Sequence, residues 1–350
     1  MVSEVYSGRT ERAQLIRLYL MKAVKAGDAN FIQKTADMFN VSRQAIFAHL
    51  KVLVSERWLD AEGKTRARTY RLGPRRVHWV KLPLRGLDES AVFYREFGWI
   101  FNDLEAELQK ICDFGFTEML NNAIDHSGGT EAEILVSRHE DSLTISIKDN
   151  GEGIFNHIAR ILGLNDPRQS ILELSKGKLT TDPDHHSGQG IFFTSRVFDY
   201  FFIISCDLTF THRDGQKNDF ILPNEELETG TSVLMKIALT STKNLKAVFD
   251  SFTGGEEESF AFSKTIVPVQ LAVSEGERLV SRSQAKRILN RFEKFSTVVL
   301  DFEGVDTIGQ AFADEVFRVF ARKHPEIELH PIHITEDVRK AIQAAQSGND

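Results

Sequence analysis

The sequence predicts a multidomain α+β chain with domains over residues 1–80, 88–240 and 260–345. The length of 350 residues suits two or three domains of ordinary size. Apolar spacing in the first segment predicts mainly helices, and the middle segment follows the order helix, helix, strands, loop, helix, strands. The last segment alternates strand, helix, strand, helix, which implies a small α/β layer.

Composition limits where such a protein works. It is that of a folded protein, with 41% hydrophobic and 27% charged residues. The two cysteines, Cys112 and Cys206, provide neither a disulfide framework nor a metal-binding spacing. The N-terminus is polar, and no uninterrupted apolar stretch reaches the roughly 20 residues that a membrane helix needs. We therefore expect a cytoplasmic protein that has no membrane partner.

Charge is distributed unevenly along the chain. Residues 1–80 hold 15 Lys and Arg against 7 Asp and Glu, a net charge of +8, which leaves −15 for the remainder. A basic N-terminal segment in an otherwise acidic chain indicates that only the N-terminal domain binds a polyanion. The alternative is an ordinary solvated basic surface.

The N-terminal domain is predicted to hold three helices and a basic hairpin. Leu15, Leu18 and Met21 recur at helical spacing in the first helix. Ser42 is a good N-cap for the third helix, and two short strands are predicted around Gly63. This order, and the stretch ADMFNVSRQAIFAHLKVL above all, resembles a winged helix-turn-helix.

The resemblance implies that DNA is a partner of this domain. A recognition helix enters the major groove with polar residues near its N-terminus, where Arg43 and Gln44 stand in this sequence. The residues expected to contact DNA are Arg43, Gln44, Lys51, Lys64, Arg66 and Arg68. The alternative is a winged helix that contacts proteins.

In the middle domain, polar residues share one face of a helix that is otherwise built for burial. Glu118, Asn122 and Asp125 stand at positions i, i+4 and i+7 of FTEMLNNAIDHSGG. An asparagine amide oxygen is a suitable ligand for Mg²⁺. A glutamate one turn earlier can orient or deprotonate a water or hydroxyl.

Two glycine-rich motifs follow. In IKDNGEGI, Asp149 ends a strand and can accept a hydrogen bond from an exocyclic amine such as that of adenine, while Gly151 and Gly153 let the backbone turn sharply. In HSGQG, Gly188 and Gly190 precede a helix, whose bare N–H groups make a phosphate cradle.

Each motif alone is a weak signal, but their order is specific. A helix with ExxxN, a strand ending in DNGEGI, a polar stretch, HSGQG before a helix, and GTS before a last strand resemble the GHKL ATPase superfamily over about 150 residues. This superfamily includes histidine kinases, DNA gyrase and the anti-sigma kinases. The resemblance implies an α/β sandwich that binds ATP and Mg²⁺. The stretch between the motifs, residues 156–187, is then expected to form a mobile lid.

The resemblance also implies a role for each matched residue. Glu118 matches the general base, and Asn122 matches the Mg²⁺ ligand. Asp149 matches the carboxylate that binds adenine, and Thr231 the threonine that supports the water beside it. The other positions expected to contact the nucleotide are Asp125, Gly151, Gly153, Gly188 and Gly190.

The C-terminal domain resembles a STAS-like domain, and VVLDFEGVDTIGQAFADEVF carries the resemblance. Antagonists of that class place a phosphorylatable Ser or Thr at the start of this helix, where Gln310 and Ala311 stand here, and Thr307 is the nearest hydroxyl. We therefore favour a module that binds a protein partner, with a plain packing domain as the alternative.

Taken together, these features predict an ATP-responsive, DNA-binding transcriptional regulator with slow ATP hydrolysis. The alternative is an anti-sigma-type Ser/Thr protein kinase that acts on a partner or on a STAS-like domain. A scaffold that binds nucleotide without turnover is a third hypothesis. The helices over residues 89–111 contain no histidine, which argues against histidine phosphotransfer. Proteins of both classes often form homodimers, and we carry a homodimer forward by that analogy alone.

Overall fold

A computed structural model describes residues 8–64, 68–179, 188–214, 220–253, 262–272 and 278–347. Contacts divide it into two compact units. One holds the residues up to His78 together with Val136–Leu143, and the other holds Trp79–Leu135 and the residues from Thr144 onward.

The N-terminal unit begins with three helices and a hairpin, in the predicted order. These elements are α1 (Gly8–Lys25), α2 (Phe31–Phe39), α3 (Arg43–Ser55), β1 (Leu59–Glu62) and β2 (Thr69–Leu72). Strands β1 and β2 pair antiparallel. The predicted cap of α3 is confirmed, because the side chain of Ser42 accepts a hydrogen bond from the Ala45 N–H. Their interpretation as a winged helix-turn-helix stays a prediction.

The buried face of α1 differs in part from the one that its spacing suggests. Leu15 is 57% exposed and Leu18 is 50% exposed, whereas Ile16 and Leu20 are buried. The buried pair packs into one core with Leu50 and its neighbours on α3. Since Ile16 and Leu20 also stand four residues apart, helical spacing alone could not decide between the two faces.

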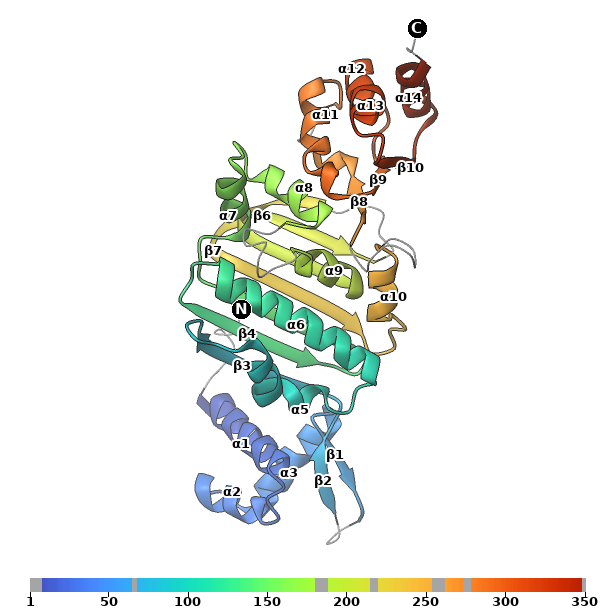
Figure 1. Cartoon of the computed structure of the whole chain (residues 1–350). Helices are drawn as coiled ribbons and strands as arrows, with labels where there is room; N and C mark the ends of the chain where they lie inside the picture. Colours follow the sequence, from blue (N-terminus) through green and yellow to red (C-terminus); the bar gives the residue numbers. More distant parts are fainter. Residues whose placement is uncertain are drawn as a thin grey trace. The chain divides into compact units, whose positions relative to one another are not determined.

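A five-stranded sheet carries the middle of the chain (Figure 1), in the order β3-β4-β5-β7-β6. Its strands are β3 (Arg76–Pro83), β4 (Glu131–Arg138), β5 (Ser142–Asp149), β6 (Tyr200–Arg213) and β7 (Phe220–Ala238). Strand β3 was not predicted, and it forms an edge of the sheet. Strands β6 and β7 pair antiparallel. Strand β6 is continuous with a bulge around Cys206, whereas the sequence predicted two separate strands over this stretch.

Helices cover one face of this sheet, as Figure 1 shows for α6 (Ala106–His126) and α9 (Gly190–Val197). Alternate residues of the strands, such as Ile134 of β4 and Ile145 of β5, are buried. A shorter helical stretch precedes α6 and consists of α4 (Glu89–Val92), the π-helical turn η2 (Phe93–Phe97) and α5 (Gly98–Phe101).

The stretch predicted as a mobile lid contains two helices, α7 (Ile154–Leu162) and α8 (Arg168–Lys176). The lid prediction is wrong for α8, because its residues 170–176 are all buried. The end of the predicted lid, residues 180–187, lies outside the described residues.

The C-terminal domain has the predicted strand–helix–strand–helix order from β9 onward. The parallel sheet β10-β9-β8 consists of β8 (Lys264–Pro268), β9 (Thr297–Asp301) and β10 (Glu328–Ile332). Its helical elements are η3 (Val269–Ala272), α11 (Arg282–Leu289), η4 (Phe292–Lys294), α12 (Gln310–Asp314), η5 (Glu315–Phe320), α13 (Ala321–Lys323) and α14 (Glu336–Ser347), and α10 (Leu245–Asp250) precedes them. Strand β8 and helices α10 and α11 were not predicted.

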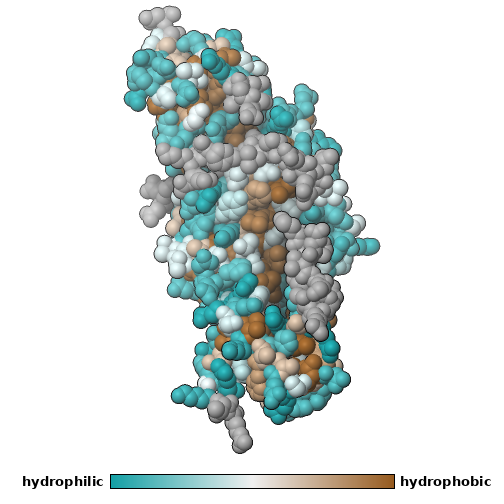
Figure 2. All heavy atoms as spheres, turned by 180° about the vertical axis from the view of Figure 1, so that it is seen from behind, coloured by the Kyte–Doolittle hydropathy of each residue, from teal (hydrophilic) through white to brown (hydrophobic). Residues whose placement is uncertain are grey.

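The core of the C-terminal domain extends into the middle domain. It includes Leu172 of α8 and Phe192 and Phe193 of α9, beside residues such as Val298 and Phe312. The face seen in Figure 2 is largely hydrophilic, with apolar side chains gathered along its middle. Among the described residues, every helix is too short or too polar to cross a membrane.

Candidate functional site

A cavity of about 340 Å³ opens in the middle domain between helices α6, α7, α8 and α9 and strands β5 and β7. Six of the predicted site residues line it: Glu118, Asn122, Asp149, Gly188, Gly190 and Thr231. These residues come from four separate stretches of the chain, so the fold assembles them as the motifs predicted.

Helix α6 presents Glu118 and Asn122 to the cavity. The Glu118 carboxylate packs against the first residue of α9, since a Cβ atom on Gly190 would lie 2.0 Å from Glu118 Oε2. The Asn122 amide nitrogen donates to Met119 Sδ at 3.9 Å, which makes the amide oxygen the atom available to a cation. A carboxylate and an amide oxygen therefore face the start of a helix.

Asp149 ends β5 at the wall of the cavity and is buried. Burial raises the pKa of its carboxyl, although hydrogen bonds oppose this shift. Asp149 Oδ1 accepts the N–H of Gly151 at 2.8 Å and the N–H of Thr231 at 3.2 Å. A desolvated carboxyl held by two backbone donors is a fixed acceptor for a ligand.

Thr231 links the two sides of this wall. Its N–H donates to Asp149, and its Oγ1 accepts the N–H of Ile154, the first residue of α7, at 2.9 Å. The hydroxyl thus fixes the start of α7 against β7.

The glycines of DNGEG shape the backbone and lie outside the residues that line the cavity. A Cβ on Gly151 would meet the Ser127 carbonyl oxygen at 2.1 Å, so only glycine fits there. Gly153 has φ of +88° and would place a Cβ 2.6 Å from Ser205 Oγ. Asn150, the residue before Gly151, accepts the N–H groups of Thr130 and Glu131 through its side-chain oxygen and so ties this turn to the start of β4.

Gly188 and Gly190 line the cavity from the stretch that leads into α9. The Gly188 carbonyl accepts the N–H of Leu179 at 3.1 Å, and Gly188 adopts φ of +67°, a region that favours glycine. Gly190 begins α9, so the N–H groups of the first turn of this helix stand beside Glu118.

A third predicted nucleotide contact, besides Gly151 and Gly153, is not among the residues that line the cavity. Asp125 is exposed and does not line the cavity, although Asn122 and His126 on the same helix do. Asp125 stands nearly two full turns after Glu118 and so on the same side of α6, and helical periodicity therefore does not by itself exclude it from the cavity. Its predicted role has no support from this geometry.

The sequence reasoning missed two histidines in the cavity, His126 and His157, whose rings lie 6.3 Å apart. His126 stands four residues after Asn122, a spacing that could have revealed it. The Nδ1 atom of His157 bonds Glu152, while its Nε2 atom is buried and has no hydrogen-bond partner among the described residues. Hydrogen bonds from Arg160 and from His157 lower the pKa of Glu152 to about 2. An ionised Glu152 favours the tautomer with the proton on Nδ1, which directs the Nε2 atom of His157 to a ligand.

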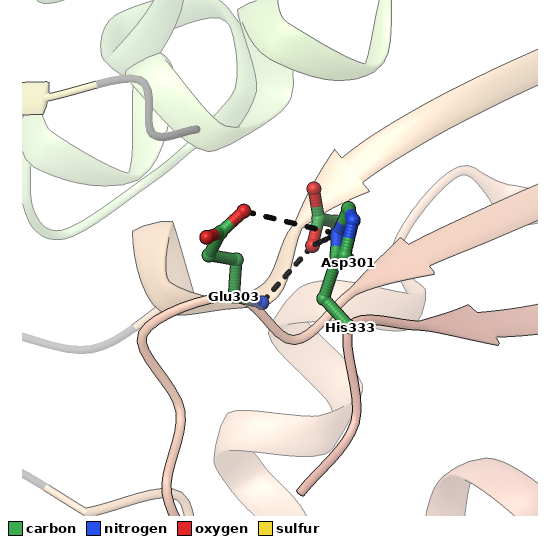
Figure 3. Close-up of side chains that lie close together, drawn as sticks. All are labelled: Asp301, Glu303 and His333. Atoms are coloured by element: carbon green, nitrogen blue, oxygen red, sulfur yellow. Dashed lines mark hydrogen bonds and ion pairs between the residues drawn. The ribbon is translucent and has the colours of Figure 1, made fainter. Parts of the chain in front are cut away.

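A second group of polar side chains lies in the C-terminal domain, where Asp301, Glu303 and His333 come together (Figure 3). Their ligand atoms lie within 4.8 Å of one another, and His333 Nδ1 is 2.9 Å from Asp301 Oδ1. The same oxygen accepts the Glu303 N–H at 3.0 Å. Because these contacts satisfy the three groups mutually, we assign no metal ion to them.

The residues expected to contact DNA are exposed wherever the structure describes them. Arg43, Gln44 and Lys51 lie on the outer face of α3, and Lys64 and Arg68 lie at the end of the β1–β2 hairpin. Arg66 lies outside the described residues.

The cavity has hydrogen-bonding groups for a polar ring near Asp149 and donors for anionic groups at the start of α9. Asp149 and His157 offer hydrogen-bonding groups to a base or sugar, and the N–H groups that begin α9 offer donors to phosphates. Because the Glu118 carboxylate lies against Gly190, a ligand at this helix terminus would also meet Glu118. The residues present therefore fit a nucleoside triphosphate with a divalent cation.

Comparisons with known families agree with this geometry. Residues 114–197 match the family model described as "Histidine kinase-, DNA gyrase B-, and HSP90-like ATPase". Residues 284–339 match the model of a STAS-like domain of unknown function. A comparison with curated proteins gave no match. The chain therefore contains a GHKL-type ATPase domain followed by a C-terminal STAS-like domain.

Proposed function

We propose that this protein binds ATP and Mg²⁺ in the cavity of its GHKL-type domain and hydrolyses the ATP slowly. The observation that carries the proposal is the meeting of Glu118 with Gly190 at the start of α9, in one cavity with Asn122 and Asp149. This arrangement brings a carboxylate, an amide oxygen and a helix N-terminus around one space.

Each residue then has a defined task. Asp149 accepts a hydrogen bond from the adenine amino group, and its own bonds to Gly151 and Thr231 hold it in place. The N–H groups that begin α9 bind phosphate oxygens. Asn122 holds Mg²⁺ through its amide oxygen, and the ion supplies neutralisation of phosphate charge. Glu118 orients the attacking water and takes up its proton.

Two substitutions separate binding from turnover. Glu118→Ala is expected to retain ATP and to lose hydrolysis by about 10²- to 10⁴-fold, the usual effect of a general base. Asn122→Ala should lose the part of the ATP affinity that depends on Mg²⁺. Calorimetric titration with a non-hydrolysable ATP analogue, with and without Mg²⁺, and release of labelled phosphate measure the two effects. Glu133→Ala is the matched control, because Glu133 pairs with Lys81 on the sheet outside the cavity. Hydrolysis by Glu118→Ala at the wild-type rate would refute the assigned base.

We further propose that the protein is a DNA-binding regulator whose DNA affinity responds to ATP. The support is the net charge of +8 over residues 1–80 and the exposure of Arg43, Gln44 and Lys51 on one helix. A ligand shifts DNA affinity only by its different affinity for two states, typically by about 1–3 kcal/mol.

The DNA-binding proposal is tested by titrating DNA at several salt concentrations with and without ATP. Lys64→Ala should reduce the salt slope by about one phosphate contact. A salt slope near zero would rule out DNA as the partner, and identical curves with and without ATP would rule out the coupling.

An anti-sigma-type Ser/Thr kinase is the second candidate, because the same chain carries a STAS-like domain with an exposed Thr307 before α12. A single-turnover assay with labelled ATP distinguishes the two. Label that appears as free phosphate supports hydrolysis, whereas label that appears on protein supports the kinase.

A further inference from the structure

Helix α8 connects the cavity with the C-terminal domain. Leu174, near its end, lines the cavity, and Leu179 just after it does so too. On the same helix, Leu172 belongs to the core of the C-terminal domain. One short helix therefore forms part of the cavity wall and part of another domain's core.

Buried charges fix this contact. Lys176 Nζ donates to Glu173 Oε1 at 2.8 Å and to the carbonyl oxygens of Arg287 at 3.2 Å and Asn290 at 2.9 Å. Asn290 Nδ2 also donates to Glu173 Oε1 at 3.2 Å. Burial lowers the pKa of Lys176 to about 8, which Glu173 opposes. Buried charges are tolerated only where such partners are fixed in space.

Arg291, in the loop after α11, completes the contact with its forked guanidinium. Nη1 donates to Glu173 Oε2 at 3.0 Å and to the Glu173 carbonyl at 3.2 Å. Nη2 donates to the carbonyl oxygens of Gly177, at 2.9 Å, and Lys178. These carbonyls follow α8 directly and lead to Leu179 in the cavity wall. Arg291 itself holds φ of +65°, which is uncommon for a residue other than glycine.

Helix α9 provides a second connection. Phe192 lines the cavity and lies 4.6 Å from the ring of Phe262, which precedes β8 of the C-terminal domain. A Cβ on Gly177 would meet both rings, at 2.8 Å and 2.9 Å, so the end of α8 packs between them. Two of the helices that border the cavity, α8 and α9, thus contact the same domain.

We infer that the STAS-like domain sets the nucleotide affinity of the GHKL-type domain, with Arg291 as the positioning residue that holds the α8 wall of the cavity. This inference rests on the proposed ATP binding and adds its regulation. Whatever displaces the STAS-like domain would move Leu174, Leu179 and Phe192 together and weaken nucleotide binding. By reciprocity, nucleotide must tighten the contact between α8 and the STAS-like domain.

Arg291→Lys tests the positioning role in the full-length protein. Lysine keeps the charge beside Glu173, but its single ammonium group cannot bond Glu173 and the Gly177 and Lys178 carbonyls at the same time. The dissociation constant for a non-hydrolysable ATP analogue should rise by about 5- to 150-fold, the usual range for coupled sites. Arg282→Lys is the matched control on α11, because Arg282 is exposed and pairs with Asp314. It should leave the dissociation constant unchanged.

Hydrogen exchange on the wild-type protein gives an independent measurement that needs no variant. The same analogue should slow exchange in α6 and α9, which line the cavity, and also in α11 (Arg282–Leu289), which does not. Protection of α6 and α9 without α11, or an Arg291→Lys affinity equal to that of wild type, would overturn the inference and leave ATP binding intact. Absence of saturable binding would overturn the proposed function, and this inference with it.

Discussion

Replacing Glu173 by glutamine removes the carboxylate that lies between two buried cations. The side chain of Lys176 is 0% exposed and that of Arg291 is 8% exposed, and both bond Glu173, at 2.8 Å and 3.0 Å. Glutamine has nearly the same shape, but one oxygen becomes an amide nitrogen that can only donate. That nitrogen must then face the donor groups of a lysine or an arginine.

The expected loss of stability follows from the burial of the two cations that bond Glu173. Removing one partner of a buried ion pair costs about 3–5 kcal/mol, because the remaining charge stays uncompensated. For a unit of this size, 1 kcal/mol changes the melting temperature by about 2–4 °C, so Glu173→Gln should lower it by roughly 6–20 °C. The loss of Glu173 would also lower the pKa of Lys176 further, because Glu173 raises it in the native protein.

Thermal unfolding followed by circular dichroism at neutral pH measures this effect. Glu328→Gln is the control, since Glu328 is 71% exposed and pairs with His330 on the surface of the same domain. An exposed pair of this kind contributes at most about 1 kcal/mol. If Glu173→Gln melted within 2–3 °C of the control, a range of about one kcal/mol, the buried charges would not hold α8 in the way described.

Substitutions of three further residues have expected outcomes. The folded pKa of Lys176, about 8, lies below its ordinary value of 10.5, so the unfolded chain binds more protons in this window. Denaturant unfolding should therefore show that the free energy of unfolding of the wild type, relative to that of Lys176→Met, rises by roughly 3 kcal/mol between about pH 8 and 10.5. A difference that does not change with pH would contradict the burial of Lys176. Asp149→Asn should raise the melting temperature of the nucleotide-free protein at neutral pH, because burial raises the pKa of Asp149 and its ionised form costs stability. The same variant should bind ATP about 10- to 150-fold more weakly in a calorimetric titration, and full affinity would exclude Asp149 as the adenine acceptor. Gly190→Ala should slow hydrolysis by about 10²-fold, because its Cβ would lie 2.0 Å from Glu118 Oε2 and displace that carboxylate, and an unchanged rate would exclude the contact.

The sequence predicted the local parts of the cavity well. The spacing of Glu118 and Asn122 placed both on one face of α6, and the glycines of the two motifs marked sharp turns beside a strand and a helix. Such features depend on residues a few positions apart, and their backbone requirements are therefore visible in the sequence itself. The cap at Ser42 was predictable for the same reason.

Sequence patterns did not predict which face of a helix would pack against another element. In α1, both Leu15 with Leu18 and Ile16 with Leu20 satisfy helical spacing, and only packing decided that the second pair is buried. On α6, the cavity accepts His126 and excludes Asp125, although the two are neighbours in sequence. Periodicity shows which residues share a face, but it does not show what that face will meet.

By itself, then, the sequence determined the helices, turns and glycines that can form a nucleotide site, because each is fixed by short-range backbone geometry. Only the tertiary structure decided that the predicted lid contains a buried helix whose Glu173 bonds Arg291, a residue 118 positions later. No sequence pattern around Glu173 or Arg291 predicts that the two form an ion pair. Their pairing arises because α8 contacts the cavity on one side and the C-terminal core on the other, where the three buried charges bond one another, the Asn290 amide and the carbonyls around them.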